Sequence, residues 1–110
     1  MILNKEKVVQ NFGLDEASYQ KLLLDTIGQV EDFERRLNTL LSASCDYEEI
    51  AKGAHFIKGS SSMLGMEEIA QFALELEEAA EGKQNVSVLK AKAAELNRAL
   101  KEVKKLVSKS

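Results

Sequence analysis

The sequence predicts an all-α fold, an antiparallel up-down four-helix bundle with a short extra helix at the N-terminus. The 110 residues include no proline, which loop-rich and β-rich folds use at turns and edges. Apolar side chains recur every three or four residues along most of the chain, which is the spacing of a buried helix face. We expect a single domain over residues 1–110, with the core of the bundle at about 15–108.

The first half of the chain predicts two helices. A short helix is expected over residues 3–12, and Gly13 ends it. Asp15 is a good N-cap for the second helix, which Gly28 interrupts at either a close helix approach or a bend. The apolar stripe of this second helix consists of Tyr19, Leu22, Leu23, Ile27, Val30, Phe33, Leu37, Leu40 and Leu41.

The third helix is expected after a loop at residues 42–45. Asp46 caps it, and Glu49 stands three residues further on, as in a capping box. Gly65 ends or kinks this helix. Its inward side chains are Ile50, Ala54, Ile57, Ser61 and Leu64.

Two more helices follow. Glu67 and Glu68 open the fourth, because acidic side chains suit the positive end of the helix dipole. A turn at residues 82–85 leads to the last helix, over about 86–107. Four amphipathic helices joined by short loops bury their stripes best as an antiparallel bundle. The last two stripes are Ile69, Phe72, Ala73, Leu76 and Ala80, then Leu89, Ala93, Leu96, Leu100, Val103 and Val107.

Composition and charge exclude several classes of protein. The net charge is −3, and although residues 85–110 hold 7 basic and 2 acidic side chains, no aromatic residue among them could stack on bases. We therefore interpret this segment as a solvated helix face and expect no nucleic acid. No run of about 18 apolar residues and no secretory signal is present, so no membrane is expected. A lone cysteine, Cys45, fits a cytoplasmic protein.

The only histidine of the chain, His55, falls in the middle of the third helix. Residues three, four and seven positions apart share a helix face, so His55, Lys58, Gly59 and Ser62 should face solvent together. Gly59 weakens the helix but leaves room for a second macromolecule beside the imidazole. Lys58 would place a positive charge beside the ring, where it could hold an anionic group, and Ser62 would donate a further hydrogen bond.

An imidazole is largely neutral near pH 7, so one of its nitrogens is a competent nucleophile. An acceptor should hold the proton on the other nitrogen, and Glu77 on the fourth helix is our candidate. One histidine without a nearby cysteine is a poor metal-ligand set, so no metal is expected in this chain. The residues that we expect to dock a partner are Phe56, Lys52 and Met63.

Residues 54–65 combine His-x-x-Lys-Gly-Ser-Ser with a later Leu-Gly, and this segment resembles the signature of the histidine phosphotransfer (HPt) domain of bacterial and fungal multistep phosphorelays. Residues 11–19 and 74–82 are similar to the family's entry into its second helix and to its fourth helix and turn. The resemblance implies that His55 accepts a phosphoryl group, that Lys58 supports it and that Gly59 clears the approach. It places Glu77 where the family often carries a Gln or Glu.

The resemblance also implies partners. The chain would take its phosphoryl group from the phosphoaspartate of one receiver domain and pass it to another. Its partners would then be response-regulator receiver domains and a hybrid histidine kinase. It would have no kinase activity and no cofactor of its own, because the divalent metal would belong to the receiver. The length and Met1 favour a free-standing protein, and a bundle that closes its own core favours a monomer.

Three alternatives stay open. A phosphoacceptor domain of a chemotaxis-type histidine kinase would need a kinase domain on the same polypeptide, and 110 residues leave no room for one. The helix pair of an ordinary sensor kinase usually carries an acidic residue directly after the histidine and a proline five residues after it, where this chain has Phe56 and Ser60. A non-catalytic helical adaptor does not explain the histidine beside the Lys58–Gly59 pair. The sequence identifies neither the cognate kinase and receivers nor the direction of phosphate flow.

Overall fold

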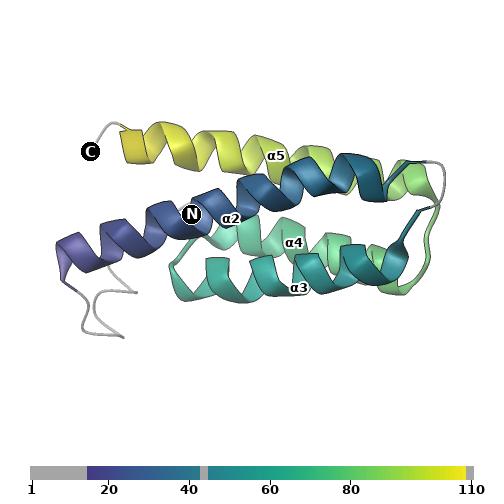
Figure 1. Cartoon of the computed structure of the whole chain (residues 1–110), viewed down its shortest axis with the longest axis horizontal. Coiled ribbons are helices and arrows are strands. Elements are labelled where there is room, and N and C mark those ends of the chain that lie inside the picture. Colours follow the sequence, from purple (N-terminus) through teal and green to yellow (C-terminus); the bar gives the residue numbers. More distant parts are fainter. Residues whose placement is uncertain (1–14, 43–44, 109–110) are drawn as a thin grey trace.

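A computed structural model describes residues 15–42 and 45–108 and forms four helices within them. They are α2 (Glu16–Leu40), α3 (Tyr47–Met63), α4 (Glu67–Glu81) and α5 (Val86–Ser108). Consecutive helices run in opposite directions, and α2 and α4 each pack against both α3 and α5 (Figure 1). The predicted antiparallel four-helix bundle is confirmed. The helix expected at residues 3–12, with its end at Gly13, lies outside the described residues.

The predicted capping residues begin and end the helices. Asp15 Oδ1 accepts a hydrogen bond from a backbone N–H in the first turn of α2 at 2.7 Å, and Asp46 Oδ1 accepts one from Glu49 N–H at 3.2 Å. The second half of the capping box is replaced, because Asp46 N–H donates to the Leu40 carbonyl at 3.0 Å. Gly65 adopts a φ of 78°, the left-handed conformation that commonly follows a helix end.

Two buried or bridging tyrosines fix both ends of α3. Tyr19 on α2 is buried, and its hydroxyl donates to the Leu64 carbonyl at the end of α3 at 2.9 Å. The Tyr47 hydroxyl, at the start of α3, donates to the Gln84 carbonyl after α4 at 2.7 Å. Between these anchors, α3 packs on a core whose largest fully buried side chains are Tyr19, Leu23, Val30, Leu37, Ile50, Ile57, Met66, Ile69, Leu76, Leu89, Leu96 and Val103.

The edges of the core differ from the predicted stripes. Leu22 is 43% exposed, so its assignment to the core is wrong; it lies on the flank of α2 beside the buried Leu23. Four other predicted core residues pack only partly buried against the edge of the core: Leu40, Phe72, Ala93 and Val107. Small, polar or loop positions give a weak periodic signal, so several buried residues were absent from the predicted stripes, among them Thr26, Met66, Ala79 and Ala99.

The close helix approach is at Gly53 rather than at Gly28. A Cβ atom added to Gly53 would lie 2.3 Å from Cε1 of the Phe33 ring, whereas one added to Gly28 would meet nothing within 4 Å. Of the two roles predicted for Gly28, a close helix approach or a bend, the close approach is therefore wrong. Gly53 lets the backbone of α3 pack directly on an aromatic ring of α2.

The surface of α5 is charged and paired with its neighbours. Lys92 Nζ donates to Glu75 Oε1 on α4 at 2.6 Å, and Lys104 Nζ donates to Glu31 Oε2 on α2 at 2.7 Å. Acidic side chains of two other helices thus offset part of the basic charge near the C-terminus. Among the described residues, no helix has both the length and the apolarity that crossing a bilayer requires.

Candidate functional site

His55 lies in the middle of α3, and the register of that helix directs it outward. Ala54 and Ile57 are buried in the core, which fixes the rotation of α3 about its axis. The His55 side chain is 68% exposed as a result. The expected exposure of this side chain is confirmed, and the ring can be reached by a macromolecule.

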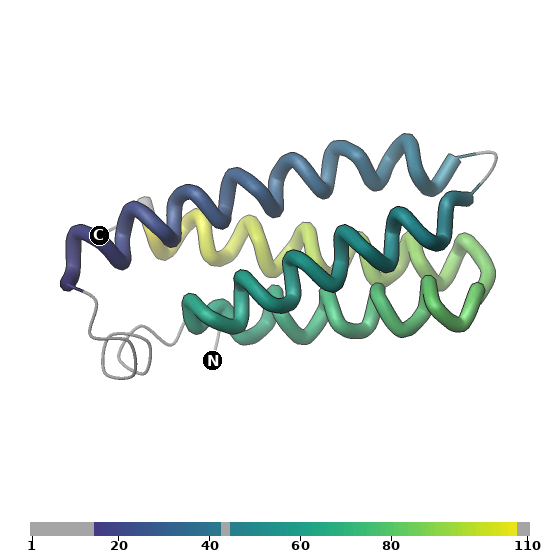
Figure 2. Tube along the Cα trace, turned by 60° about the horizontal axis from the view of Figure 1, so that its bottom comes forward, coloured from purple at the N-terminus to yellow at the C-terminus, as the bar shows by residue number. Residues whose placement is uncertain are grey.

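Glu77 on α4 contacts two side chains of α3. These helices lie side by side in both views of the bundle (Figures 1 and 2). Glu77 Oε2 lies 2.7 Å from His55 Nδ1, and Glu77 Oε1 accepts a hydrogen bond from Lys58 Nζ at 3.0 Å. The Glu77 side chain is only 10% exposed. One buried carboxylate therefore holds both the imidazole and the ammonium group.

Two opposing effects set the pKa of the Glu77 carboxyl. Burial raises this pKa, but hydrogen bonds from Lys58 and His55, together with their charges, outweigh burial and hold it below its ordinary value of 4.5. Glu77 is therefore ionised at neutral pH and can only accept hydrogen bonds. We accordingly assign the proton of the neutral imidazole to Nδ1, which places the free lone pair on Nε2.

The remaining predicted residues surround the ring unequally. Gly59 is exposed, and a Cβ atom added there would meet nothing within 4 Å, so the space one turn beyond His55 is open. Ser62 is exposed on the same side of α3. Lys58 departs from the expectation of a fully solvent-facing group, because its contact with Glu77 holds it against α4 and leaves its side chain 31% exposed.

Comparison with protein families decides what this arrangement belongs to. The family model described as "Hpt domain" matches residues 21–106. The chain belongs to the Hpt domain family. Hpt domains carry phosphoryl groups on a histidine in phosphorelays, and they interact with receiver domains and kinases. A search of curated proteins and a search of solved structures each found no match.

In this Hpt domain, the residues expected to dock a partner are exposed beside His55. Phe56 is 56% exposed and Met63 is 59% exposed, one and eight positions further along α3. Lys52, one turn before His55, is exposed and pairs with acidic side chains of its own helix. Their role in docking stays a prediction.

A hollow beside His55 was not anticipated from the sequence. It lies between α3 and α4, has a volume of about 580 Å³ and reaches the His55–Glu77 pair. Alanines line it on both helices, at Ala51 and Ala80, and Lys83 stands at its edge. The sequence pattern assigned Ala80 to the buried stripe of the fourth helix, so no hollow was expected there. The short alanine side chains leave the space above them unfilled.

Proposed function

We propose that this Hpt domain is a phosphorelay intermediate that accepts a phosphoryl group on His55 from the phosphoaspartate of one receiver domain and transfers it to an aspartate of another. The observation that carries the proposal is the 2.7 Å contact between His55 Nδ1 and Glu77 Oε2. It directs the lone pair of Nε2 outward on an exposed ring. His55 is also the only histidine in the sequence.

The proposed step is an in-line displacement at phosphorus. The Nε2 lone pair attacks the aspartyl phosphate, the phosphorus–oxygen bond to the aspartate breaks, and its electron pair leaves with the carboxylate. The ring then carries the phosphoryl group on Nε2 and a proton on Nδ1, so it is positively charged. Glu77 offsets that charge without taking the proton. Because the reverse step uses the same atoms, transfer runs in both directions.

The neighbouring residues have supporting roles in this proposal. Lys58, held near the ring by Glu77, exchanges that carboxylate for a phosphoryl oxygen once the group has arrived. The open space at Gly59 admits the receiver, and the exposed Ser62 hydroxyl donates to its edge. The receiver supplies the acidic pocket and the divalent cation, so this chain needs no cofactor of its own.

The surface around His55 suits a receiver domain. Phe56 and Met63 offer apolar contact area on one side of the ring, and Lys52 offers positive charge to the acidic pocket of a receiver. We take the donor to be the receiver domain of a hybrid histidine kinase and the acceptor to be a response regulator. We further propose that the protein is a monomer and acts in the cytoplasm, where a lone cysteine such as Cys45 stays reduced.

The test is direct phosphoryl transfer from a panel of phosphorylated receivers. We expect an acid-labile, base-stable label on the wild-type protein and no label on His55→Gln, with the helical circular dichroism of the two proteins unchanged. Labelling that persists in His55→Gln would overturn the assignment. Direct labelling by a chemotaxis-type kinase core with ATP, in the absence of any receiver, would instead favour a kinase phosphoacceptor domain.

A further inference from the structure

A groove lies between α2 and α5. These two helices form the side of the bundle away from the paired helices α3 and α4, which hold the candidate site (Figure 1). Its volume is about 460 Å³, which is within the range of small-molecule pockets. The groove-lining side chains of α5 include the two short ones of Ala93 and Ala94. We call it the α2/α5 groove, and it is lined by Glu34, Leu37, Asn38, Leu41, Ser42, Lys90, Ala93, Ala94 and Asn97.

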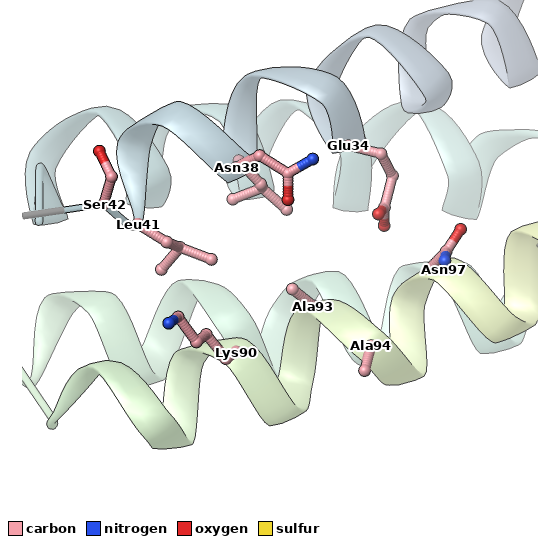
Figure 3. Close-up of a pocket in the computed structure, with 9 residues that line it drawn as sticks. Glu34, Asn38, Leu41, Ser42, Lys90, Ala93, Ala94 and Asn97 are labelled. Carbon is pink, nitrogen blue, oxygen red and sulfur yellow. The ribbon is translucent and has the colours of Figure 1, made fainter.

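Glu34 is the unusual residue of the α2/α5 groove. Its carboxylate points from α2 toward α5, while the Asn97 amide points from α5 toward α2 (Figure 3). Glu34 Oε1 is shielded from solvent and has no hydrogen-bond partner. Buried polar atoms in folded proteins are nearly always paired, so this oxygen is an acceptor without a donor. Burial raises the pKa of the Glu34 carboxyl to about 7, against the opposing charge of Lys101.

The residues that line the groove indicate which chemical group would bind to Glu34. Among the residues that the structure describes, Glu34 is the only acidic side chain that lines the groove, and a lone carboxylate is a poor ligand set for a metal ion. A guanidinium group presents its N–H donors in a fork that matches a carboxylate. The amides of Asn38 and Asn97 flank that position with further hydrogen-bonding groups (Figure 3).

The middle and the other end of the groove indicate the rest of the ligand, beyond the guanidinium. Leu37, Leu41 and the two alanines offer apolar surface along the middle of the groove, which suits an aliphatic stem. Lys90 lines the groove two turns before Asn97 on α5, so its ammonium disfavours a second positive charge and favours an anionic end. The groove is thus acidic at one end, apolar in the middle and basic at the other end.

We propose that the α2/α5 groove binds a small guanidino acid, with its guanidinium on Glu34, its aliphatic stem over the apolar lining and its carboxylate toward Lys90. This site is separate from the phosphoryl-transfer site and does not rest on the proposed function. It would give the domain a small-molecule input on the side away from His55.

The test is a titration of the full chain with 4-guanidinobutanoate, followed by calorimetry and by the side-chain amide resonances of Asn38 and Asn97. Glu34→Gln should weaken binding at least ten-fold. The matched control is Glu31→Gln, one turn earlier on α2 and outside the groove lining, which should leave binding unchanged. Lys90→Ala should weaken 4-guanidinobutanoate but not butylguanidinium, which has no carboxylate.

Two further measurements keep the test independent of folding. Ala94→Leu retains Glu34 but fills the groove, so it should abolish binding while circular dichroism stays helical. Wild-type binding should be about ten-fold tighter at pH 8 than at pH 6, because the guanidinium needs an ionised Glu34 while the lysines near it keep their charge. Absence of saturable millimolar binding, or equal affinity of Glu34→Gln, overturns the proposal. Tighter binding of a capped arginine tripeptide overturns it in favour of a partner protein's side chain.

Discussion

At the scale of single residues, the chemistry of the site depends on one carboxylate with two partners. Glu77 orients the imidazole through Nδ1 and restrains Lys58 through its other oxygen. A residue that contacted only the His55 ring would not hold Lys58 near that ring. Because Glu77 holds both groups, the tautomer of His55 and the place of the nearest positive charge are set together, before any partner arrives.

Replacing Glu77 by Gln should remove the negative charge of this side chain while keeping its hydrogen bond to His55. The amide oxygen can still accept from His55 Nδ1, so the tautomer is retained, but the negative charge opposite the phosphorylated ring is lost. Charged hydrogen bonds exceed neutral ones by about 1 kcal/mol, so we expect the transfer equilibrium to shift roughly five-fold toward the phosphorylated receiver. The measurement is the equilibrium ratio of phosphorylated Hpt domain to phosphorylated receiver. The exposed neighbour Glu78→Gln is the control, and an equal shift in both variants would contradict the role of Glu77.

Removing the ammonium group of Lys58 should slow transfer without preventing docking. Lys58 Nζ is held on Glu77 close to His55, so Lys58→Ala removes a charge that would stabilise the phosphoryl oxygens. We expect the saturated transfer rate to fall about ten-fold or more, while calorimetry with the unphosphorylated receiver gives an unchanged dissociation constant. Lys58→Arg, which keeps the charge, serves as the comparison. Weakened docking with a normal saturated rate would assign Lys58 to the interface instead.

The sequence was sufficient to expect Glu77 beside His55, because the fourth helix was expected next to the third and the family resemblance places a Gln or Glu at that position. It was not sufficient to find Glu34. The unpaired oxygen of Glu34 depends on which side chains of α5 line the groove with it, and two of these are the short side chains of Ala93 and Ala94. A side chain that lacks a hydrogen-bond partner in the fold produces no recognisable pattern in the sequence.

At the scale of the helices, local signals predicted the boundaries well and tertiary contacts were harder to predict. Asp15 and Asp46 cap helices through bonds to residues three positions away, so sequence spacing alone identifies them. The importance of Gly53 depends on the Phe33 ring of another helix, which no spacing rule along α3 reveals. The burial of Met66 between two helices is likewise a product of how the chain turns there.

Alanine substitutions at two helical glycines, Gly28 and Gly53, should change the stability of the protein in opposite directions. Gly28→Ala gains helix propensity in open space and should stabilise the protein by about 0.5–1 kcal/mol. Gly53→Ala puts a methyl group against the Phe33 ring, so despite the same gain it should destabilise by about 1–3 kcal/mol. Urea unfolding measures both changes.

A third glycine separates stability from docking. Gly59→Gln also enters open space and should leave the protein at least as stable as wild type, yet its side chain should block the approach of a receiver to His55. Normal docking of Gly59→Gln, or stabilisation by Gly53→Ala, would contradict this account of the helix surfaces.

At the scale of the whole molecule, the two sides of the bundle are built differently. Between α3 and α4, Glu77 is buried but paired with the Lys58 ammonium and the His55 ring, so burial of its charge is offset. Between α2 and α5, Glu34 is only partly buried, but its Oε1 is shielded from solvent and unpaired. Ionisation of Glu34 therefore carries a desolvation cost that the charge of Lys101 only partly offsets. The stability of the bundle should therefore depend on pH mainly through Glu34 near neutrality, and through Glu77 only in acid.

Protonation of Glu34 should stabilise the folded bundle. Its pKa in the fold is about 7, above the ordinary value of 4.5, so its contribution is fully present below about pH 4.5 and is lost as the pH rises through about 7. Because Glu34 is only partly buried, solvent screening reduces the full effect of the shift to about 1–2 kcal/mol. Urea unfolding of wild type and Glu34→Gln at pH 5 and pH 8 measures it. The neutral glutamine should remove this part of the pH dependence and make the variant more stable than wild type at pH 8, whereas Glu31→Gln should follow wild type. Parallel stability profiles for wild type and Glu34→Gln would show that Glu34 is solvated in the folded protein.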